Sequence, residues 1–241
     1  AGNTAGADIR PKIVGGDDAG EGAYPFMAAL VRSNQPSDYD AAFCGGTVIA
    51  ARWVLTAAHC VTGRQVSSIG VITGVTTLSD DPDAGAPRTA VAAVVRHPDY
   101  VNSTLLNDIA LLYLATPVAT DATFALDDGT LLATLNLGDA LTAVGWGALE
   151  DTTPTPFPQT LQEVLLEYIP LADCRADYYD DLDARVFCAG YLAAPPRDTC
   201  YGDSGSPLLR DGGAGWRQLG ITSYGDPAGC AAEGKPGVYT D

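Results

Sequence analysis

The segment GDSGSP at residues 202–207 is the most informative stretch of this chain of 241 residues. Its Ser204 lies among glycines and can therefore sit on a tight turn whose backbone N–H groups converge on one point. A nucleophilic serine needs such N–H groups beside it, because they stabilise the negative oxygen of a tetrahedral intermediate. Taken alone, the segment fits an ordinary turn equally well, because Gly, Asp and Ser are common turn residues. A general base elsewhere in the chain would favour the catalytic interpretation.

Two histidines are available as that base. His59, in the segment TAAHC, follows an apolar stretch, which predicts a place at a strand end, and a disulfide at Cys60 would tether it there. His97, in the segment RHPDY, lies in a polar turn, where a solvated side chain is the ordinary role. An acid that orients a catalytic histidine should be buried, and Asp108 heads the hydrophobic segment DIALL. The same aspartate could also be a turn or cap residue.

The composition is that of a turn-rich β protein. Apolar residues make up 46% of the chain and charged residues 18%, and 27 Gly and 16 Pro are spread along it, which argues against disorder and against a helical bundle. Acidic residues outnumber basic ones 30 to 13, and the formal net charge of -17 would repel a nucleic-acid backbone. No stretch approaches the roughly 18 apolar residues of a membrane span. We therefore expect neither a nucleic-acid nor a membrane partner.

Short apolar segments alternate with turn residues along most of the chain. Their length and their content of Val, Ile, Thr and aromatic residues predict strands, and their spacing indicates β-barrels. The predicted strands cover residues 43–50, 53–60, 71–78, 89–95, 108–114, 141–147, 161–169, 206–210, 216–225 and 236–240. The weakly patterned residues 117–139 are expected to connect two halves of similar size, and a short helix is expected over Leu171–Tyr178.

Six cysteines fit three disulfides and hence an oxidising or extracellular compartment. Six buried free thiols would fit the same count. No cysteine pair has the close CxxC spacing of a zinc site, so the cysteines predict no metal centre.

Four motifs in chain order resemble those of the chymotrypsin-like (trypsin-fold) serine proteases. They are IVGG at 13–16, TAAHC at 56–60, DIALL at 108–112 and GDSGSP at 202–207. Separate motifs in the right order are far more specific than any one of them, and the resemblance runs from Ile13 to Asp241.

This resemblance implies an all-β fold of two packed six-stranded antiparallel Greek-key barrels, with the active site in the cleft between them. The N-terminal barrel would cover residues 13–125 and the C-terminal barrel residues 126–241, with residues 1–12 as an activation propeptide. Family members normally end in a helix after the PGVY segment, so this chain is expected to lack that C-terminal helix.

The resemblance also assigns the catalytic roles. Ser204 would be the nucleophile, His59 the general base and then acid, and Asp108 the group that orients and stabilises the imidazolium. The backbone N–H groups of Gly202 and Ser204 would form the oxyanion hole. The implied disulfides join Cys44 to Cys60, Cys174 to Cys188, and Cys200 to Cys230.

The primary specificity pocket is implied in the same way. In this family the residue six positions before the nucleophile lies at the pocket floor, and here it is Asp198. A carboxylate there pairs with Lys or Arg, so cleavage after these residues is expected. Gly225 and Gly237 match the glycines that keep the pocket open, and the backbone of Ser223, Tyr224 and Gly225 would pair with an extended substrate. On its own, Asp198 could be an exposed loop acid.

The start of the IVGG motif implies activation by cleavage. A cut after Lys12, by a trypsin-like protease or by the chain itself, would free the α-amine of Ile13 to pair with the carboxylate of Asp203. Because an unpaired buried carboxylate is costly, the turn around Ser204 should not settle before the cut. The uncut chain is therefore expected to be a zymogen.

No cofactor is expected. Asp80, Asp81 and Asp83 form an acidic loop near the place where some family members bind calcium. Three carboxylates without a complete ligand pattern favour a solvated turn.

The sequence thus predicts a secreted, monomeric serine endopeptidase. Its expected partners are peptides or proteins with Lys or Arg before the scissile bond, an activating protease, and protein inhibitors. The alternative is a non-catalytic binding module on the same fold, which the intact set of triad residues disfavours.

Overall fold

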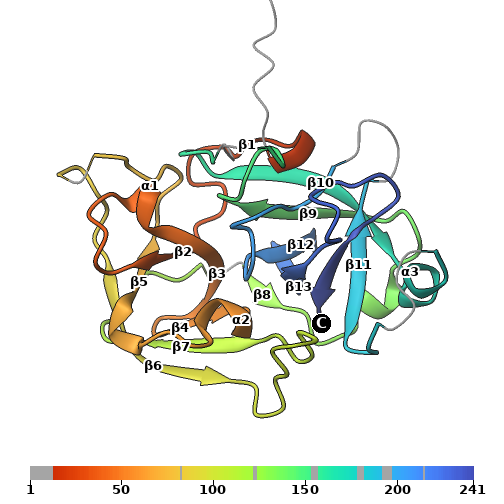
Figure 1. Ribbon diagram of the computed structural model, residues 1–241, viewed down its shortest axis with the longest axis horizontal. Coiled ribbons are helices and arrows are strands. Elements are labelled where there is room, and N and C mark those ends of the chain that lie inside the picture. The colour runs from red at the N-terminus through yellow and green to blue at the C-terminus, as the bar shows by residue number, and fades with distance from the viewer. Residues whose placement is uncertain are drawn as a thin grey trace, which may run out of the picture.

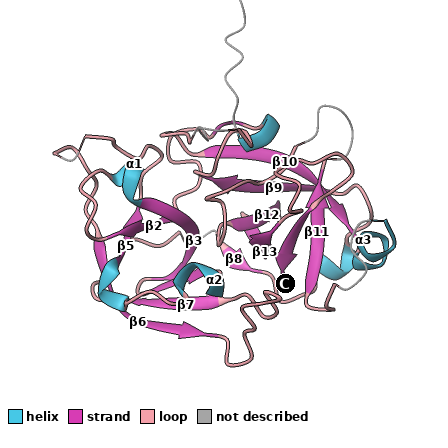
Figure 2. Ribbon diagram, viewed as in Figure 1, coloured by secondary structure: helices cyan, strands magenta, loops and turns pink. Residues whose placement is uncertain are grey.

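The computed structural model describes residues 13–81, 83–121, 124–152, 157–177, 182–191, 197–213 and 215–241. Strands dominate this part of the chain and the helices are short (Figure 2). The strands are β1 (Asp17–Asp18), β2 (Met27–Arg32), β3 (Ala42–Ala50), β4 (Trp53–Thr56), β5 (Ile69–Thr73), β6 (Thr89–Arg96), β7 (Ala110–Leu114), β8 (Ala125–Leu126), β9 (Ala140–Gly145), β10 (Gln162–Ile169), β11 (Val186–Gly190), β12 (Pro207–Asp211), β13 (Trp216–Tyr224) and β14 (Gly237–Thr240). The helices are α1 (Asp38–Ala41), α2 (Ala58–Val61) and α3 (Leu171–Asp177), with short 3-10 turns η1 (Ile13–Gly15), η2 (Val66–Ser68) and η3 (Leu132–Thr134).

The first six-stranded sheet closes into an antiparallel barrel in the order β2-β3-β4-β7-β6-β5. It lies on the left in Figure 1, with α2 on the side that faces the other strands. Successive side chains of a strand point to opposite faces, and in β7 every second residue is buried. These buried residues, Ala110, Leu112 and Leu114, pack in one core with Leu30 and Val54 of the neighbouring strands.

The second barrel lies on the right in Figure 1. Its strands pair in the order β9-β10-β11-β14-β13-β12, and β12 pairs back with β9 to close the ring. Two short strands are added outside the ring, β1 antiparallel to β10 and β8 parallel to β13. The core contains Leu141, Phe187, Leu208 and Tyr239. The expected fold of two six-stranded antiparallel barrels is therefore confirmed.

The segment that begins at Ile13 packs on the second barrel, although it precedes the first barrel in the sequence. Ile13 is 0% exposed and lies in the same core cluster as Leu141, Phe187 and Leu208. The N–H group of Asp198 donates to the Val14 carbonyl at 3.3 Å, which ties this segment to the chain ahead of Ser204.

The structure corrects several strand predictions. The strand expected over 53–60 ends at Thr56, because α2 begins at Ala58. The strand expected over 71–78 ends at Thr73, because Gly74 turns the chain with a φ of 74°. The strands β1, β2, β8 and β11 were not predicted. For β2 the reason is that five of its six residues are buried, so it lacks the alternation of a half-exposed strand.

The expected short helix is present as α3, and Tyr178 lies outside the described residues. Among the residues described, no helix combines the length and the apolar character that crossing a membrane would require.

Candidate active site

The first barrel brings His59 and Asp108 together. His59 Nδ1 lies 2.6 Å from Asp108 Oδ2, and the His59 backbone N–H donates to Asp108 Oδ1 at 2.8 Å. Asp108 is 0% exposed, and its Oδ2 also accepts a hydrogen bond from the Ser223 hydroxyl at 2.6 Å. Because Nδ1 is engaged by the carboxylate, Nε2 is the ring nitrogen left to exchange a proton with a nucleophile.

The residue before Asp108 anchors this part of the chain to the second barrel. Asn107 has a left-handed backbone, with a φ of 54°, and its side-chain amide donates to the Asp99 carbonyl at 2.8 Å. Its side-chain oxygen accepts a hydrogen bond from Arg185, which directly precedes β11, at 2.8 Å. A second contact between the barrels adds to this, since the Thr240 side-chain hydroxyl donates to the Asp108 backbone carbonyl at 3.4 Å.

The turn that holds Ser204 is fixed by the carboxylate of its neighbour. Asp203 Oδ1 accepts from the N–H of Gly147 at 2.8 Å and Oδ2 accepts from the N–H of Cys200 at 2.9 Å. The Ser204 carbonyl accepts from the N–H of Gly45 at 2.8 Å, which links the turn to β3 of the first barrel.

Gly202 gives this turn its shape, because its φ of 94° lies in the left-handed region that favours glycine. Within the described chain, the N–H groups of Gly202 and Ser204 donate to no protein acceptor. Two such free donors beside a serine are suited to bind an oxyanion.

A cavity of about 310 Å³ opens beside Ser204. The described residues that line it include two acids and no base: Asp198, Thr199, Cys200, Tyr201, Ser204, Thr222, Ser223, Tyr224, Gly225, Asp226, Pro227, Gly229 and Cys230. Asp198 is 3% exposed, and its Oδ1 accepts from the Thr199 N–H at 2.8 Å. Burial raises the pKa of Asp198 to about 7, against the lowering effect of hydrogen bonds from the backbone of Thr199 and Ala231. The cavity is therefore suited to a cationic side chain.

Of the two glycines expected at the pocket, Gly225 lines the cavity itself and Gly237 lies next to the carboxylate of Asp198. Gly225 lines the cavity, and a Cβ at this residue would have no neighbouring atom within 4 Å. At Gly237 a Cβ would lie 2.8 Å from Asp198 Oδ1. Side chains at these two positions would enter the cavity or displace its carboxylate.

Among the described residues, no cation lies beside the buried side chain of Asp203. It is 0% exposed and has no ion pair with any described residue, and burial raises its pKa to about 7. The N–H groups of Gly147 and Cys200 hold this carboxylate, so backbone groups of the described chain fix the turn around Ser204. The expectation that a cut after Lys12 completes this turn stays a prediction. Lys12 lies outside the described residues.

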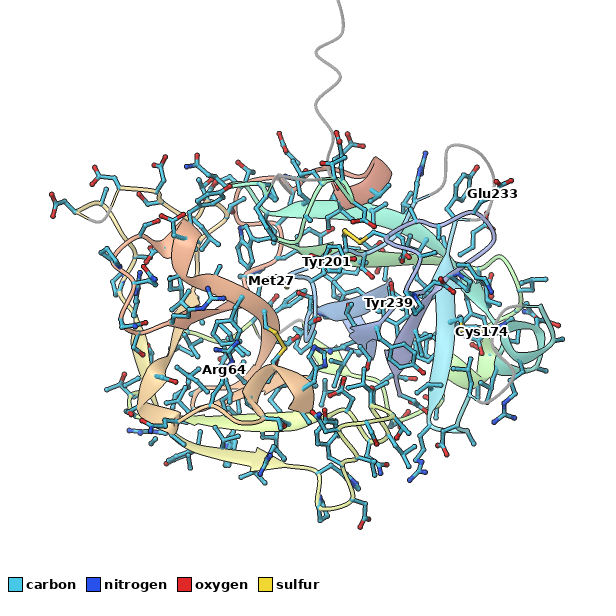
Figure 3. The ribbon with its side chains drawn as sticks, in the orientation of Figure 1. Met27, Arg64, Cys174, Tyr201, Glu233 and Tyr239 are labelled. Atoms are coloured by element: carbon cyan, nitrogen blue, oxygen red, sulfur yellow. A yellow bond between two sulfur atoms is a disulfide. The ribbon has the colours of Figure 1, made fainter. Side chains whose placement is uncertain are left out.

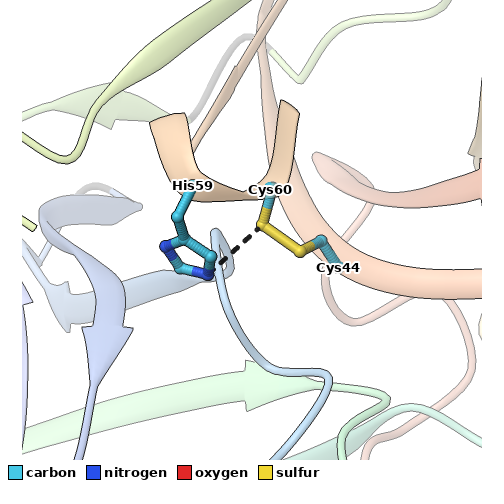
Figure 4. Close-up of side chains that lie close together, drawn as sticks. All are labelled: Cys44, His59 and Cys60. Carbon is cyan, nitrogen blue, oxygen red and sulfur yellow. Dashed lines mark hydrogen bonds between the residues drawn. A yellow bond between two sulfur atoms is a disulfide. The ribbon is translucent and has the colours of Figure 1, made fainter. Parts of the chain in front are cut away.

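The expected disulfides are all present. They join Cys44 to Cys60, Cys174 to Cys188, and Cys200 to Cys230, and no cysteine is free. The first of them lies next to the histidine, whose Nε2 is 3.8 Å from Cys60 Sγ (Figure 4).

Possible metal ligands meet at one place in the described residues, at Cys44, His59 and Cys60. The two sulfur atoms are joined in a disulfide, so they are not thiolate ligands and this group does not fit a metal ion. The acidic loop at Asp80–Asp83 forms no group of this kind where it is described. There Asp81 Oδ1 accepts from the N–H of Asp83 at 2.9 Å, as in an ordinary turn.

The contact between Ser223 and Asp108 was not anticipated, since Ser223 was expected only to pair its backbone with a substrate. The two residues are 115 positions apart, and no local pattern connects them. Arg185 was likewise not a candidate, because an arginine beside an aspartate is an ordinary surface pattern.

The chain has two closed six-stranded barrels, a buried aspartate paired with a half-buried histidine on the first, and a glycine-bracketed serine on the second. Together they define a two-barrel hydrolase of the serine protease type. Residues 13–241 match the family model described as Trypsin. The chain therefore belongs to the trypsin family.

Individual relatives agree with this assignment. The chain is 34% identical to anionic trypsin of Bos taurus over 237 residues, which cover 97% of this chain and 86% of the relative. It is 32% identical to Trypsin Blo t 3 of Blomia tropicalis over 236 residues, or 95% of this chain and 81% of the relative. It is 35% identical to serine protease 56 of Homo sapiens over 242 residues, which cover 95% of this chain but only 36% of that protein.

Proposed function

We propose that the chain, once cut between Lys12 and Ile13, is a secreted endopeptidase that hydrolyses peptide bonds after Lys and Arg. The observation that carries this proposal is the buried carboxylate of Asp198 in the cavity beside Ser204. A cation of the substrate offsets the cost of ionising this buried acid, whereas a neutral side chain leaves it unpaired. The three disulfides support export to an oxidising compartment.

The reaction uses the serine, the histidine and the aspartate in turn. With a Lys or Arg side chain in the cavity, the Ser204 hydroxyl attacks the carbonyl of that residue while His59 Nε2 takes the hydroxyl proton. Asp108 keeps Nδ1 protonated and stabilises the imidazolium, since it is bonded to that nitrogen at 2.6 Å. His59 then protonates the leaving amine, and a water molecule hydrolyses the acyl-enzyme by the same steps in reverse.

The two free N–H groups of the turn stabilise the charge that develops. The carbonyl oxygen becomes an oxyanion, and the N–H groups of Gly202 and Ser204 bind it. Losing one such donor typically costs a factor of about 10² to 10³ in kcat.

Activation supplies a cation for Asp203. Cutting after Lys12 gives Ile13 a charged α-amine, which forms an ion pair with the buried carboxylate and keeps it ionised at neutral pH. The chain's own specificity matches the bond after Lys12, so active molecules can activate others. An uncut Ser204→Ala chain should be cut at this bond when active enzyme is added and should stay intact alone. Cleavage of the purified variant without added enzyme would contradict activation by the chain itself.

An arginine ester and an organophosphate test the catalytic proposal directly. The cut chain should release a burst of product close to one equivalent per active site, and the organophosphate should label Ser204, as mass spectrometry of the peptide would show. The Ser204→Ala variant is the matched control. If the cut chain shows neither burst nor labelling, the chain is a non-catalytic binding module on a protease fold.

A further inference from the structure

A second cavity, of about 520 Å³, lies next to the serine turn. It is lined by Ala29, Arg32, Tyr39, Asp40, Ala42, Phe43, Cys44, Gly45, Arg64, Leu78, Trp146, Phe157, Pro158 and Gly202. It shares no lining residue with the cavity that contains Asp198. Gly202, whose N–H group is one of the two free donors, lines this second cavity, so the cavity borders the proposed reaction centre.

Its position is on the side of the leaving group. His59 has to protonate the leaving amine, so the substrate residues after the scissile bond must pass close to His59 Nε2. This nitrogen is 3.8 Å from Cys60 Sγ, and Cys60 is bonded to Cys44, which lines the cavity (Figure 4). Gly45, another lining residue, donates its N–H to the Ser204 carbonyl.

Two arginines meet at one aromatic ring in this cavity. The guanidinium carbon of Arg64 lies 4.0 Å from the centre of the Phe43 ring, and that of Arg32 lies 5.6 Å from it. Figure 3 shows Arg64 in front of β3, close to α2. Arg64 Nε donates to the Cys60 carbonyl at 2.9 Å, which holds the side chain toward the disulfide.

Neither arginine is neutralised by an acid in the described part of the chain. Arg32 donates to three backbone carbonyls, those of residues 40–42, and Arg64 donates to one. Burial and the charge of Arg32 lower the pKa of Arg64, as expected for two like charges held close together. Elsewhere, Arg88 pairs with the carboxylate of Asp38 at 2.8 Å. Several other described arginines also form no ion pair with a described acid, but Arg32 and Arg64 are two such cations that meet at one ring and line one cavity.

One acid also lines the cavity. Asp40 is exposed and forms no ion pair with a described residue, so the charged lining side chains are two arginines and one aspartate. The excess positive charge leaves room for one more carboxylate.

We propose that Arg32 and Arg64 bind a carboxylate of the substrate on the leaving-group side, so that the enzyme prefers Asp or Glu among the first three residues after the scissile bond. This inference rests on the proposed function. A carboxylate bound between two guanidinium groups gains charge-assisted hydrogen bonds that the isosteric amides of Asn and Gln cannot match.

Internally quenched peptides test this preference. Each peptide contains one Arg as cleavage residue, has an amidated C-terminus, and carries Glu, Gln or Lys at one of the next three positions. At one of these positions kcat/KM should be about 3- to 10-fold higher for Glu than for Gln, and the ratio should fall as salt is added. A free C-terminal carboxylate is the other source of the same charge. A second pair of peptides without Glu, one with a free and one with an amidated C-terminus, shows whether the arginines bind the terminal carboxylate instead. If kcat/KM rises only for the free C-terminus and not for Glu, the proposal is overturned.

Three variants make the test specific to these side chains. Arg64→Gln should reduce the Glu-to-Gln ratio toward 1, Arg64→Lys should keep most of it, and Asp40→Asn should raise it. The ratio of kcat/KM for the Glu and Gln peptides is measured within one enzyme preparation, so it does not depend on the fraction of active enzyme. An arginine anilide, which has no residues after the scissile bond, should be cleaved equally well by all variants. Equal rates for Glu and Gln peptides in an enzyme that cleaves the anilide would overturn this inference alone, whereas no cleavage of the anilide would count against the proposed function.

Discussion

Ser223 and His59 bind the same oxygen atom of Asp108, each at 2.6 Å. The serine is on β13 of the second barrel, whereas the histidine and the aspartate belong to the first. The orientation of the Asp108 carboxylate, and through it that of the imidazole ring, therefore depends on how the two barrels are packed.

Replacing the serine tests that dependence. In Ser223→Ala the Asp108 carboxylate loses one buried hydrogen bond, and we expect kcat on an arginine ester to fall by about 10-fold with a small change in KM. Steady-state kinetics of the cut enzyme would measure it. The neighbouring Thr222 is the matched control, because its buried hydroxyl has no hydrogen-bond partner among the described residues, so Thr222→Val should leave kcat unchanged. An unaltered kcat in Ser223→Ala would show that the hydrogen bond from Ser223 to Asp108 does not contribute to catalysis.

Asp198 should make cation binding depend on pH. Burial raises its pKa to about 7, so the carboxyl is mostly neutral at pH 6 and mostly ionised at pH 8. We expect the affinity for benzamidine, an aromatic cation, to rise by up to about 10-fold between these pH values, because only the ionised form pairs with a cation. Calorimetry in a His59→Ala background excludes titration of the histidine. Asp198→Asn should bind weakly at both values, and equal affinity at pH 6 and 8 in the parent would contradict the expectation.

A larger side chain at Gly225 should block the cavity without weakening the fold. A Cβ there meets no atom within 4 Å, so Gly225→Val should change the melting temperature by less than about 2 °C. The same side chain would project into the cavity beside Ser204, and kcat/KM for an arginine ester should fall at least about 100-fold. Calorimetry and kinetics on one preparation separate the two effects. If the variant cleaves the arginine ester with the kcat/KM of the parent, Gly225 does not control the entry of side chains into the cavity.

Asp203 should make the uncut chain less stable as pH rises. Its pKa is about 7 in the folded chain and near 4 when unfolded, so the folded state holds the extra proton between these values and loses that stabilisation as pH rises through 7. For one such carboxyl the total loss is on the order of 4 kcal/mol, of which about 3 kcal/mol falls between pH 5 and pH 8.

Chemical denaturation of uncut and cut Ser204→Ala chains at pH 5 and pH 8 would measure this effect. The cut chain should lose less stability, because the Ile13 amine pairs with the ionised carboxylate. The uncut Asp203→Asn variant is the second comparison, and its free energy of unfolding should also depend less on pH than that of the uncut parent. The same pH dependence in all three would refute the role assigned to Asp203.

The fold and the triad candidates were accessible from the sequence because they depend on local patterns. GDSGSP requires a left-handed glycine in its turn, and DIALL heads a strand with alternating burial. The strand β2 was missed because it is buried on both faces and therefore lacks a period of two. A motif or an alternating pattern within a few neighbouring residues could be recognised, whereas a strand without such a local pattern could not.

Contacts between distant residues were not accessible in the same way. The hydrogen bond from Ser223 to Asp108 and the meeting of Arg32, Phe43 and Arg64 depend on how the strands pack. The backbone N–H groups of Gly147 and Cys200 that hold Asp203 come from two separate loops and were not anticipated. A chain pattern does not reveal which N–H groups converge on a buried carboxylate.

The position of β14 bears on when the second barrel can close during synthesis. This strand, residues 237–240, lies between β11 and β13, and its Thr240 hydroxyl touches the Asp108 carbonyl. During translation the first barrel can fold as it leaves the ribosome, but the strand ring of the second barrel, which carries the Ser204 turn before β12, cannot close until these residues emerge. A nascent chain that still lacks these residues therefore cannot complete the second barrel or the contact between Thr240 and Asp108. Assembly of the site between the barrels thus waits for one of the last strands to be synthesised.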